Sequence, residues 1–148
     1  MSKVQNLLAG LGGAIALNIL HESLKKTGSD MPRVDLLGEE ALQKTLQHFG
    51  GGIDDDNTLY AATLAGDVVS NSLYYSMIGK GNPDYIWARA VAYGLAGGVG
   101  AVTLPKPMGL DEEPVAHSNK TKVLTVSYYL AGALVTAGIL AALAKKNQ

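Results

Sequence analysis

Seven polar side chains stand in otherwise apolar stretches of this sequence, where they could do chemistry if the fold brought them together. They are Asn18, His21, Glu22, Asp67, Asn71, Tyr128 and Tyr129. Asn18 and Glu22 are four residues apart, as are Asp67 and Asn71, so each pair would share one face of an α-helix. Ionisable groups are costly inside a membrane, and by default they indicate a site there. We therefore expect these side chains to form one intramembrane polar cluster.

Four interpretations of this cluster are open. In the first, which we favour, Asp67 stays protonated, or hydrogen-bonds Asn18 or a tyrosine hydroxyl, and only holds helices together. In the second, Asp67 lies on a pathway for a cation or a proton. The third is a metal site at His21, Glu22 and Asp67, although adjacent residues on a helix point about 100° apart. In the fourth, His21 and Glu22 act as an acid/base pair on a lipid headgroup. We predict no metal and no cofactor.

Four nearly uncharged stretches would position these side chains. They cover residues 4–23, 59–79, 85–104 and 122–144. About 20 apolar residues are enough to cross the hydrocarbon of a bilayer as a helix. The stretch 59–79 is the weakest because it contains Asp67 and Asn71, and it crosses only if both side chains face inward. We expect one domain over residues 1–148, an all-α integral membrane four-helix bundle.

The uncharged residues of this sequence are mostly small, since it contains eighteen glycines and only one phenylalanine. Soluble cores are filled by large side chains, whereas packed membrane helices use small residues to bring their backbones close together. We expect helix packing at Gly10, Gly13, Gly94, Gly97, Gly98 and Gly132. Glycine faces that remain unused could support a homo-oligomer.

Two long connections, 24–58 and 105–121, lie on one side of the expected bundle, and both termini lie on the other. A helix at about 34–49 is predicted in the first connection, because its apolar residues fall on one half of a 3.6-residue wheel. This amphipathic helix would lie in the membrane interface, cap the bundle, or be an ordinary helix packed on the loops. Asn57 or Thr58 would cap the following helix. Lysine and arginine residues near the span ends divide equally between the two sides, so the orientation is undecided.

Composition excludes several classes of function. A net charge of −1 without a basic patch argues against a nucleic-acid partner. The absence of cysteine excludes disulfides, thiol catalysis and cysteine metal sites. His21 and Glu22 have no nucleophile or oxyanion partner of the usual kind, so an enzyme is not the leading interpretation.

Two strings in the second half of the chain resemble small, uncharacterised bacterial membrane proteins with four spans. They are GDVVSNSLYY at Gly66–Tyr75 and GGVGAVTLP at Gly97–Pro105. The resemblance implies a bacterial inner (plasma) membrane location and supplies no activity.

The leading functional interpretation is a non-enzymatic polytopic membrane protein that self-associates or serves as a small accessory subunit of a membrane complex. One alternative is a channel or transporter that moves a small cation or proton past Asp67 and Asn71. Another is a membrane enzyme that acts on lipids. The lipid bilayer is the one partner common to all three.

Overall fold

The computed structural model describes residues 1–147, and these residues form an all-α structure without a β-strand, as expected. The helices are α1 (Lys3–Leu24), α2 (Val34–His48), α3 (Asp56–Ser76), α4 (Ile86–Thr103), α5 (Glu113–Ala116) and α6 (Asn119–Lys146). Two short 3₁₀ turns, η1 (Met77–Gly79) and η2 (Pro83–Tyr85), connect α3 to α4. The four long helices and α2 therefore coincide with the five predicted helical segments to within a few residues.

Polar caps begin three of the long helices. Ser2 accepts a hydrogen bond from the Gln5 amide, and Ser118 accepts one from the Thr121 amide. At α3 the prediction of a cap at Asn57 or Thr58 was wrong, because Asp55 is the cap. The Asp55 carboxylate accepts from both the backbone N and the hydroxyl of Thr58, at 2.8 and 2.6 Å. An aspartate that satisfies a free amide of the first turn begins the helix before either predicted residue.

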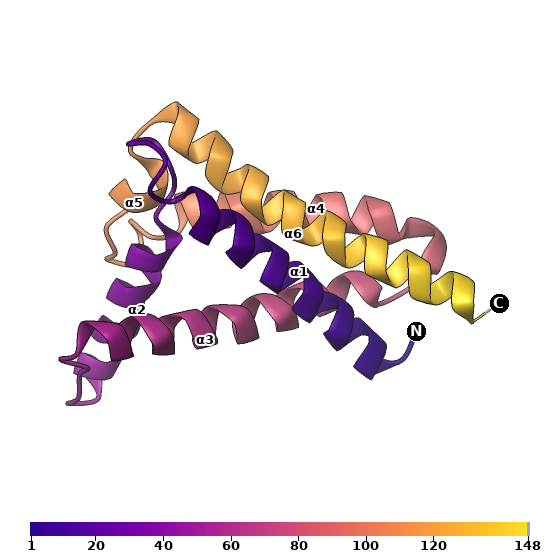
Figure 1. Ribbon diagram of the computed structural model, residues 1–148, viewed down its shortest axis with the longest axis horizontal. Helices are drawn as coiled ribbons and strands as arrows, with labels where there is room; N and C mark the ends of the chain where they lie inside the picture. The colour runs from indigo at the N-terminus through magenta and orange to yellow at the C-terminus, as the bar shows by residue number, and fades with distance from the viewer. Residues whose placement is uncertain (148) are drawn as a thin grey trace.

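The four long helices are close together at one end of the molecule and spread apart at the other. Figure 1 shows both termini at the narrow end, whereas α2 and α5 lie at the wide end. In this view α1 crosses between α3 and α6, and α3 and α6 diverge toward α2 and α5. Helix α1 packs on α3 and on α6, and α4 packs on α6. Helices α3 and α4 are therefore joined at the narrow end but not along their length.

Glycines make the closest helix contacts. At Gly10 a side chain would collide with the Ser72 carbonyl oxygen of α3, and at Gly13 with the Gly132 carbonyl oxygen of α6. On α4, a Cβ at Gly94 would lie 2.8 Å from the Leu130 Cα of α6, and one at Gly98 would lie 2.6 Å from the Val126 Cα. These helices approach until their backbones touch, which only residues without a side chain permit.

Large apolar side chains lie on the outside of the long helices. They form outward stripes at Val4, Leu8, Leu11, Ile15 and Ile19 of α1, at Val69 and Leu73 of α3, and at Trp87, Val91, Leu95 and Val99 of α4. The buried positions instead carry mostly small or polar residues, among them Asn6, Ala9, Ala14, Asn71, Ser72, Ala90, Thr125, Ala133, Thr136 and Ala137. A soluble protein shows the opposite arrangement and rarely exposes contiguous apolar stripes.

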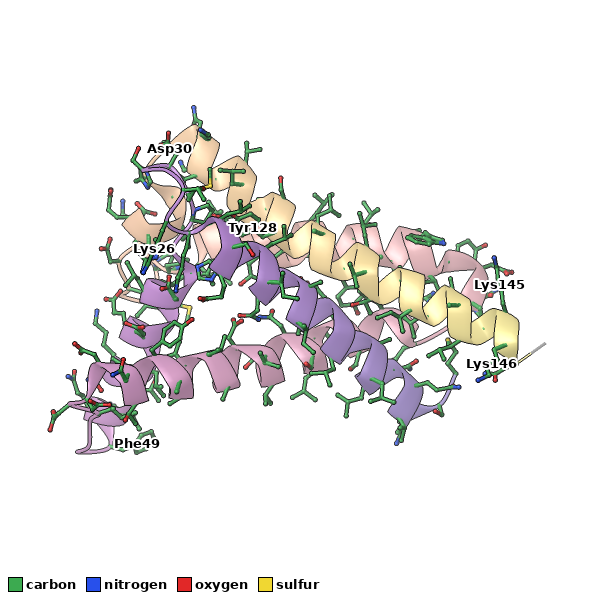
Figure 2. All side chains as sticks on the ribbon, in the orientation of Figure 1. Lys26, Asp30, Phe49, Tyr128, Lys145 and Lys146 are labelled. Atoms are coloured by element: carbon green, nitrogen blue, oxygen red, sulfur yellow. The ribbon has the colours of Figure 1, made fainter. Side chains whose placement is uncertain are left out.

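Charged side chains gather at the two ends of the helices. Lys145 and Lys146 lie at the end with the termini, and Lys26 and Asp30 lie at the opposite end (Figure 2). Arg89, which is near the start of α4, donates to the Ile78 and Asn82 carbonyls at 2.8 Å each. It therefore bonds the end of a neighbouring helical segment.

By length and composition alone, α1 and α6 are the two helices apolar enough to cross a membrane among residues 1–147. Four such helices were expected from the sequence. Helix α3 is less apolar because it carries Asp67, Asn71 and several hydroxyl groups. Helix α4 contains Arg89 and is rich in glycine.

We predict that Gly98→Ala destabilises the protein by about 1–3 kcal/mol, because a new methyl group must displace the α6 backbone at Val126. Gly138→Ala is the matched control, since no atom lies within 4 Å of the added Cβ. In this control the better helix propensity of alanine predicts an unchanged or higher stability. Thermal unfolding in mild detergent, followed by circular dichroism, compares the two variants. Equal stability of both would contradict the close α4–α6 contact.

Candidate functional site

A cavity of about 600 Å³ lies at the wide end of the molecule, between α3 and α4 and beneath α2. Its walls are mostly apolar and include Leu37 and Leu42 of α2, Leu64 of α3, Ala101 of α4, and Leu104 directly after α4. Exposed lining residues on both sides mark the mouth, Gly66 and Ser70 on α3 and Ala96 on α4. The cavity therefore opens sideways between α3 and α4. Tyr74 and Tyr129 border it as well.

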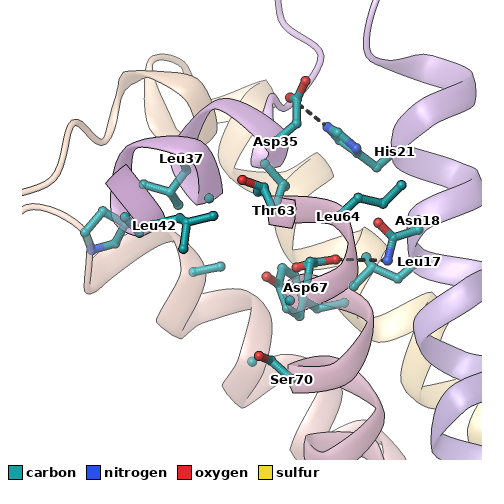
Figure 3. Close-up of a pocket in the computed structure, with 18 of the residues that line it drawn as sticks. Leu17, Asn18, His21, Asp35, Leu37, Leu42, Thr63, Leu64, Asp67 and Ser70 are labelled. Atoms are coloured by element: carbon teal, nitrogen blue, oxygen red, sulfur yellow. Dashed lines mark hydrogen bonds and ion pairs between the residues drawn. The ribbon is translucent and has the colours of Figure 1, made fainter. Parts of the chain in front are cut away.

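Asp67 lines this cavity and is held by two amide side chains. Its Oδ2 accepts from the Asn18 amide nitrogen at 2.9 Å, and its Oδ1 accepts from Asn71 at 2.9 Å. Figure 3 shows the Asn18 contact, which joins α1 to α3. Asn18 also donates to the Ala14 carbonyl at 2.9 Å, so both of its amide hydrogens are used. The two amides thus fix the direction of the carboxylate and leave it at the cavity wall.

A second polar group, centred on Asp35 of α2, lies at the wide end of the cavity. Its side chain is only 7% exposed. Arg33 binds both of its carboxylate oxygens, at 2.9 and 2.8 Å. His21 Nε2 lies 3.2 Å from Asp35 Oδ1, and Lys25 Nζ lies 3.3 Å from Oδ2. Glu22 completes the group through His21 Nδ1 at 3.3 Å and Lys25 Nζ at 2.9 Å. These ion pairs tie the end of α1 to the start of α2 (Figure 3).

Helix α2 covers the cavity but has no fully buried residue of its own. Few other polar contacts join it to the remainder of the chain. Lys44 donates to the Gly109 carbonyl, and Glu40 accepts from the Asp111 amide at 2.9 Å. The apolar face of α2 lies over the cavity and not against another helix face. The buried ion pairs of Asp35 are therefore the main contacts that hold α2 to α1.

The structure brings six of the seven residues of the expected polar cluster together around one cavity, and five of them form two polar groups. Asn18, Asp67 and Asn71 form the first group. His21 and Glu22 belong to the second, where they bind Asp35 and Lys25. The cavity wall includes all of these except Asn71.

The two adjacent tyrosines of the expected cluster separate. Tyr129 lines the cavity. Tyr128 does not, and its hydroxyl donates to the Met31 sulfur at 3.9 Å (Figure 2). Neighbouring residues on a helix point about 100° apart, so only one of the two can face α3. The placement of Tyr128 in the cluster is therefore corrected.

The expected packing glycines lie at the contacts between the long helices. Gly10 lies against α3, Gly13 and Gly132 lie against each other, and Gly94 and Gly98 lie against α6. Gly97 differs from these, because it lines the cavity, where a Cβ would lie 3.1 Å from the Tyr74 ring and 3.2 Å from the Tyr129 ring.

Sequence reasoning missed Asp35, Lys25 and Thr63. A local signal existed for Asp35, since it follows Pro32 in the first turn of the predicted amphipathic helix, where an acidic side chain favours the helix dipole. The pairing of Asp35 with His21 had no sequence signal, because it depends on how the connection after α1 folds back and brings α2 beside the end of α1. Thr63 resembles any other hydroxyl residue of α3 until the cavity beside it is known.

Comparison of this chain with protein-family models, with curated proteins and with solved structures finds no match. The resemblance to small bacterial four-span proteins therefore stays a prediction. Among residues 1–147, no three histidine, aspartate or glutamate side chains are grouped so that they could hold a metal ion.

We predict that Asp35→Asn loosens α2, because it leaves Arg33 and Lys25 without their common carboxylate. Removing one partner of a buried ion pair costs about 3–5 kcal/mol. Hydrogen exchange of the α2 amides should accelerate, whereas exchange in α6 should not change. Asp54→Asn is the control, because Asp54 is an exposed loop residue. If both variants retained wild-type protection of α2, the ion pairs would not be what holds this helix.

The attachment of α2 should also depend on pH. Burial opposes ionisation of Asp35, but the adjacent His21 ring and the hydrogen bonds from Arg33 outweigh it and hold the pKa of this carboxyl well below its ordinary value of 3.8. The docked state thus binds fewer protons than a state with α2 released, so docking is fully favoured above about pH 4 and weakens as the pH falls below that value. A spin label on Thr45→Cys should become more mobile only in that acid range. Loss of order already at pH 6 would contradict this.

Proposed function

We propose that this chain is a non-enzymatic integral membrane protein in which α1, α3, α4 and α6 all cross the bilayer, and that it holds an apolar molecule in the cavity between α3 and α4. The observation that carries the membrane proposal is the sorting of side chains. Large apolar residues face outward on α1, α3 and α4, while small and polar residues fill the interior. Water would oppose such an arrangement, whereas lipid favours it.

The same sorting supports spans at α3 and α4, although their composition alone does not. Asp67 and Asn71 of α3 bind each other and Asn18 in the interior, so the outward face of α3 carries Val69 and Leu73, which are 59% and 57% exposed. The 18 residues of α4 extend about 27 Å at the helical rise per residue. This is close to the roughly 30 Å of a hydrocarbon core.

The cavity supports binding rather than catalysis. Its volume lies within the range of about 300–1,000 Å³ that is usual for small-molecule sites. Its mouth faces the side of the bundle, where a membrane would supply apolar molecules directly. His21 is the base that a lipid-acting enzyme would need, but each of its ring nitrogens lies beside a carboxylate oxygen. A substrate atom could approach Nδ1 only by displacing Glu22, and Nε2 only by displacing Asp35.

A second candidate function is movement of a small cation or proton past Asp67 and Asn71. It is favoured by the access that the cavity gives to Asp67. It is opposed by the layer between the cavity and the narrow end, where Tyr75, Ile78, Ala133 and Ala137 are completely buried. If this candidate were right, Asp67→Asn would abolish flux into proteoliposomes. Wild-type liposomes without any flux would exclude it.

Self-association, or assembly as a small subunit of a bacterial inner-membrane complex, remains part of the proposal. Gly138 supports it, because nothing lies within 4 Å of a Cβ added at this residue. Close approach of a second membrane helix is therefore sterically open there, away from the mouth of the cavity. Native mass spectrometry in mild detergent tests this part, and a spectrum with monomers alone would remove self-association.

The natural absence of cysteine allows a direct test of the four spans. We predict that Val69→Cys on α3 and Leu95→Cys on α4 stay unlabelled by a charged maleimide in sealed membrane vesicles and react only after denaturation in detergent. Gly51→Cys and Asn82→Cys are the matched controls in the connections. They should react from opposite sides, in right-side-out and in inverted vesicles respectively, or the reverse. Labelling of Val69→Cys and Leu95→Cys in sealed vesicles would limit the spans to α1 and α6.

A further inference from the structure

The carboxyl group of Asp67 has hydrogen-bond donors but no ion-pair partner among the described residues. Both contacts to its oxygens come from neutral amides, those of Asn18 and Asn71. The other carboxylates at the cavity, Glu22 and Asp35, are each paired with basic side chains. A carboxylate in apolar surroundings is stabilised chiefly by a positive charge beside it. Asp67 therefore offers a position for a cation that the chain itself does not supply.

Thr63 provides a second, independent indication of a ligand. It lies one helical turn before Asp67 on the same face of α3 and lines the cavity (Figure 3). Its side chain is 9% exposed, and its hydroxyl is buried without a hydrogen-bond partner. Buried hydroxyls elsewhere in these helices, such as those of Ser72 and Thr136, bond the carbonyl four residues earlier. A buried polar atom left without a partner is unfavourable, so the Thr63 oxygen is suited to a polar group that enters the cavity.

The charges around the cavity select the sign of that group. Of the three carboxyl groups that line the cavity, Glu22 and Asp35 are compensated by basic side chains, which leaves Asp67 as the uncompensated one among the described residues. An anionic headgroup or a fatty acid beside Asp67 would lie next to a like charge, which is costly in apolar surroundings. The rings of Tyr74 and Tyr129 also line the cavity, and aromatic faces attract cations.

The size of the cavity excludes a helix from a partner protein as its occupant. An α-helix with its side chains is about 10 Å across, so about 600 Å³ would hold only about five residues of one. A small organic molecule fits this volume.

From these observations we infer that the cavity between α3 and α4 binds a lipophilic organic cation, with its charged centre between Asp67 and Thr63 and its apolar part against the walls formed by α2 and α4. This inference rests on the proposed function and names the class of ligand. A protonated amine would donate directly to the two oxygens. A cation without hydrogens on its charged centre would be held by charge and by the tyrosine rings.

Two probes of the same shape and opposite charge test the inference. Purified protein in dodecyl maltoside is equilibrated with tetraphenylphosphonium or with tetraphenylborate, and binding is measured by equilibrium dialysis against protein-free micelles. The cation should bind saturably, with one site per chain, and the anion should not bind. Asp67→Asn should weaken the cation by about tenfold or more, because it removes a charged contact. Asp84→Asn, an exposed residue at the opposite end of the molecule, is the control and should bind as the wild type does.

The outcomes separate this inference from the function on which it rests. Equal binding of both probes would overturn the cation inference while keeping the cavity as a site for apolar molecules. No binding of either probe would overturn it as well, even if the cysteine labelling supports four spans. Should Asp67→Asn not fold, Thr63→Val replaces it, since this change removes the unpartnered hydroxyl and keeps the side-chain shape. For Thr63→Val the probe is protonated 1-adamantylamine, whose ammonium group can donate to the Thr63 oxygen. Several-fold weaker binding of this amine than by the wild type is expected, and unchanged binding would contradict the site.

Discussion

The contact between α1 and α6 at Gly13 and Gly132 is the constraint on which the rest of the bundle depends. A side chain at Gly132 would lie 2.9 Å from the Gly13 carbonyl oxygen and 2.6 Å from the Tyr75 hydroxyl. Tyr75 of α3 is completely buried at this crossing and donates to the Tyr129 carbonyl at 2.8 Å. Three helices therefore meet at one level, in the middle of α1 and of α6 and near the end of α3. Straight helices that touch at one level and cross at an angle must separate away from it, and the cavity occupies the space that this separation leaves.

The interior consists mostly of small and polar residues that allow close contact between helix backbones, and it buries few large apolar side chains. Threonines at positions 125 and 136 of α6 are completely buried and satisfy their hydroxyls on their own helix. Such an interior excludes little apolar surface from water, so it would stabilise a soluble protein poorly. Among lipids the comparison changes, because dispersion contacts and hydrogen bonds between helices are the interactions available there. Under the proposed membrane location, the outward apolar stripes and the polar interior would have one common cause, the lipid around the helices.

Much of this fold could be predicted from local features of the sequence. Helix positions follow from the length of the uncharged stretches, and a hydrogen bond between Asp67 and Asn18 was among the contacts expected to hold the helices together. Two kinds of feature could not be predicted: those that depend on how a helix is rotated about its own axis, and those that depend on the path of a connection between helices. Tyr128 and Tyr129 are neighbours, and only the rotation of α6 decides which of them lines the cavity. Asp35 reaches His21 because the connection after α1 folds back over the bundle, and no residue spacing encodes that return.

Arg89 has a consequence for how the cavity could admit a molecule. Its bonds to the Ile78 and Asn82 carbonyls fasten α4 to the turn that follows α3, and Tyr74 donates to the Tyr93 carbonyl at 2.7 Å just beyond it. These bonds hold α3 and α4 together at the end near the termini, whereas the cavity separates the two helices at the wide end. If the mouth widened to admit a molecule, α3 and α4 would separate at the wide end. No backbone hydrogen bond within either helix would have to break, but the contacts of Lys44 with Gly109 and of Glu40 with Asp111, which join α2 to the segment after α4, would open.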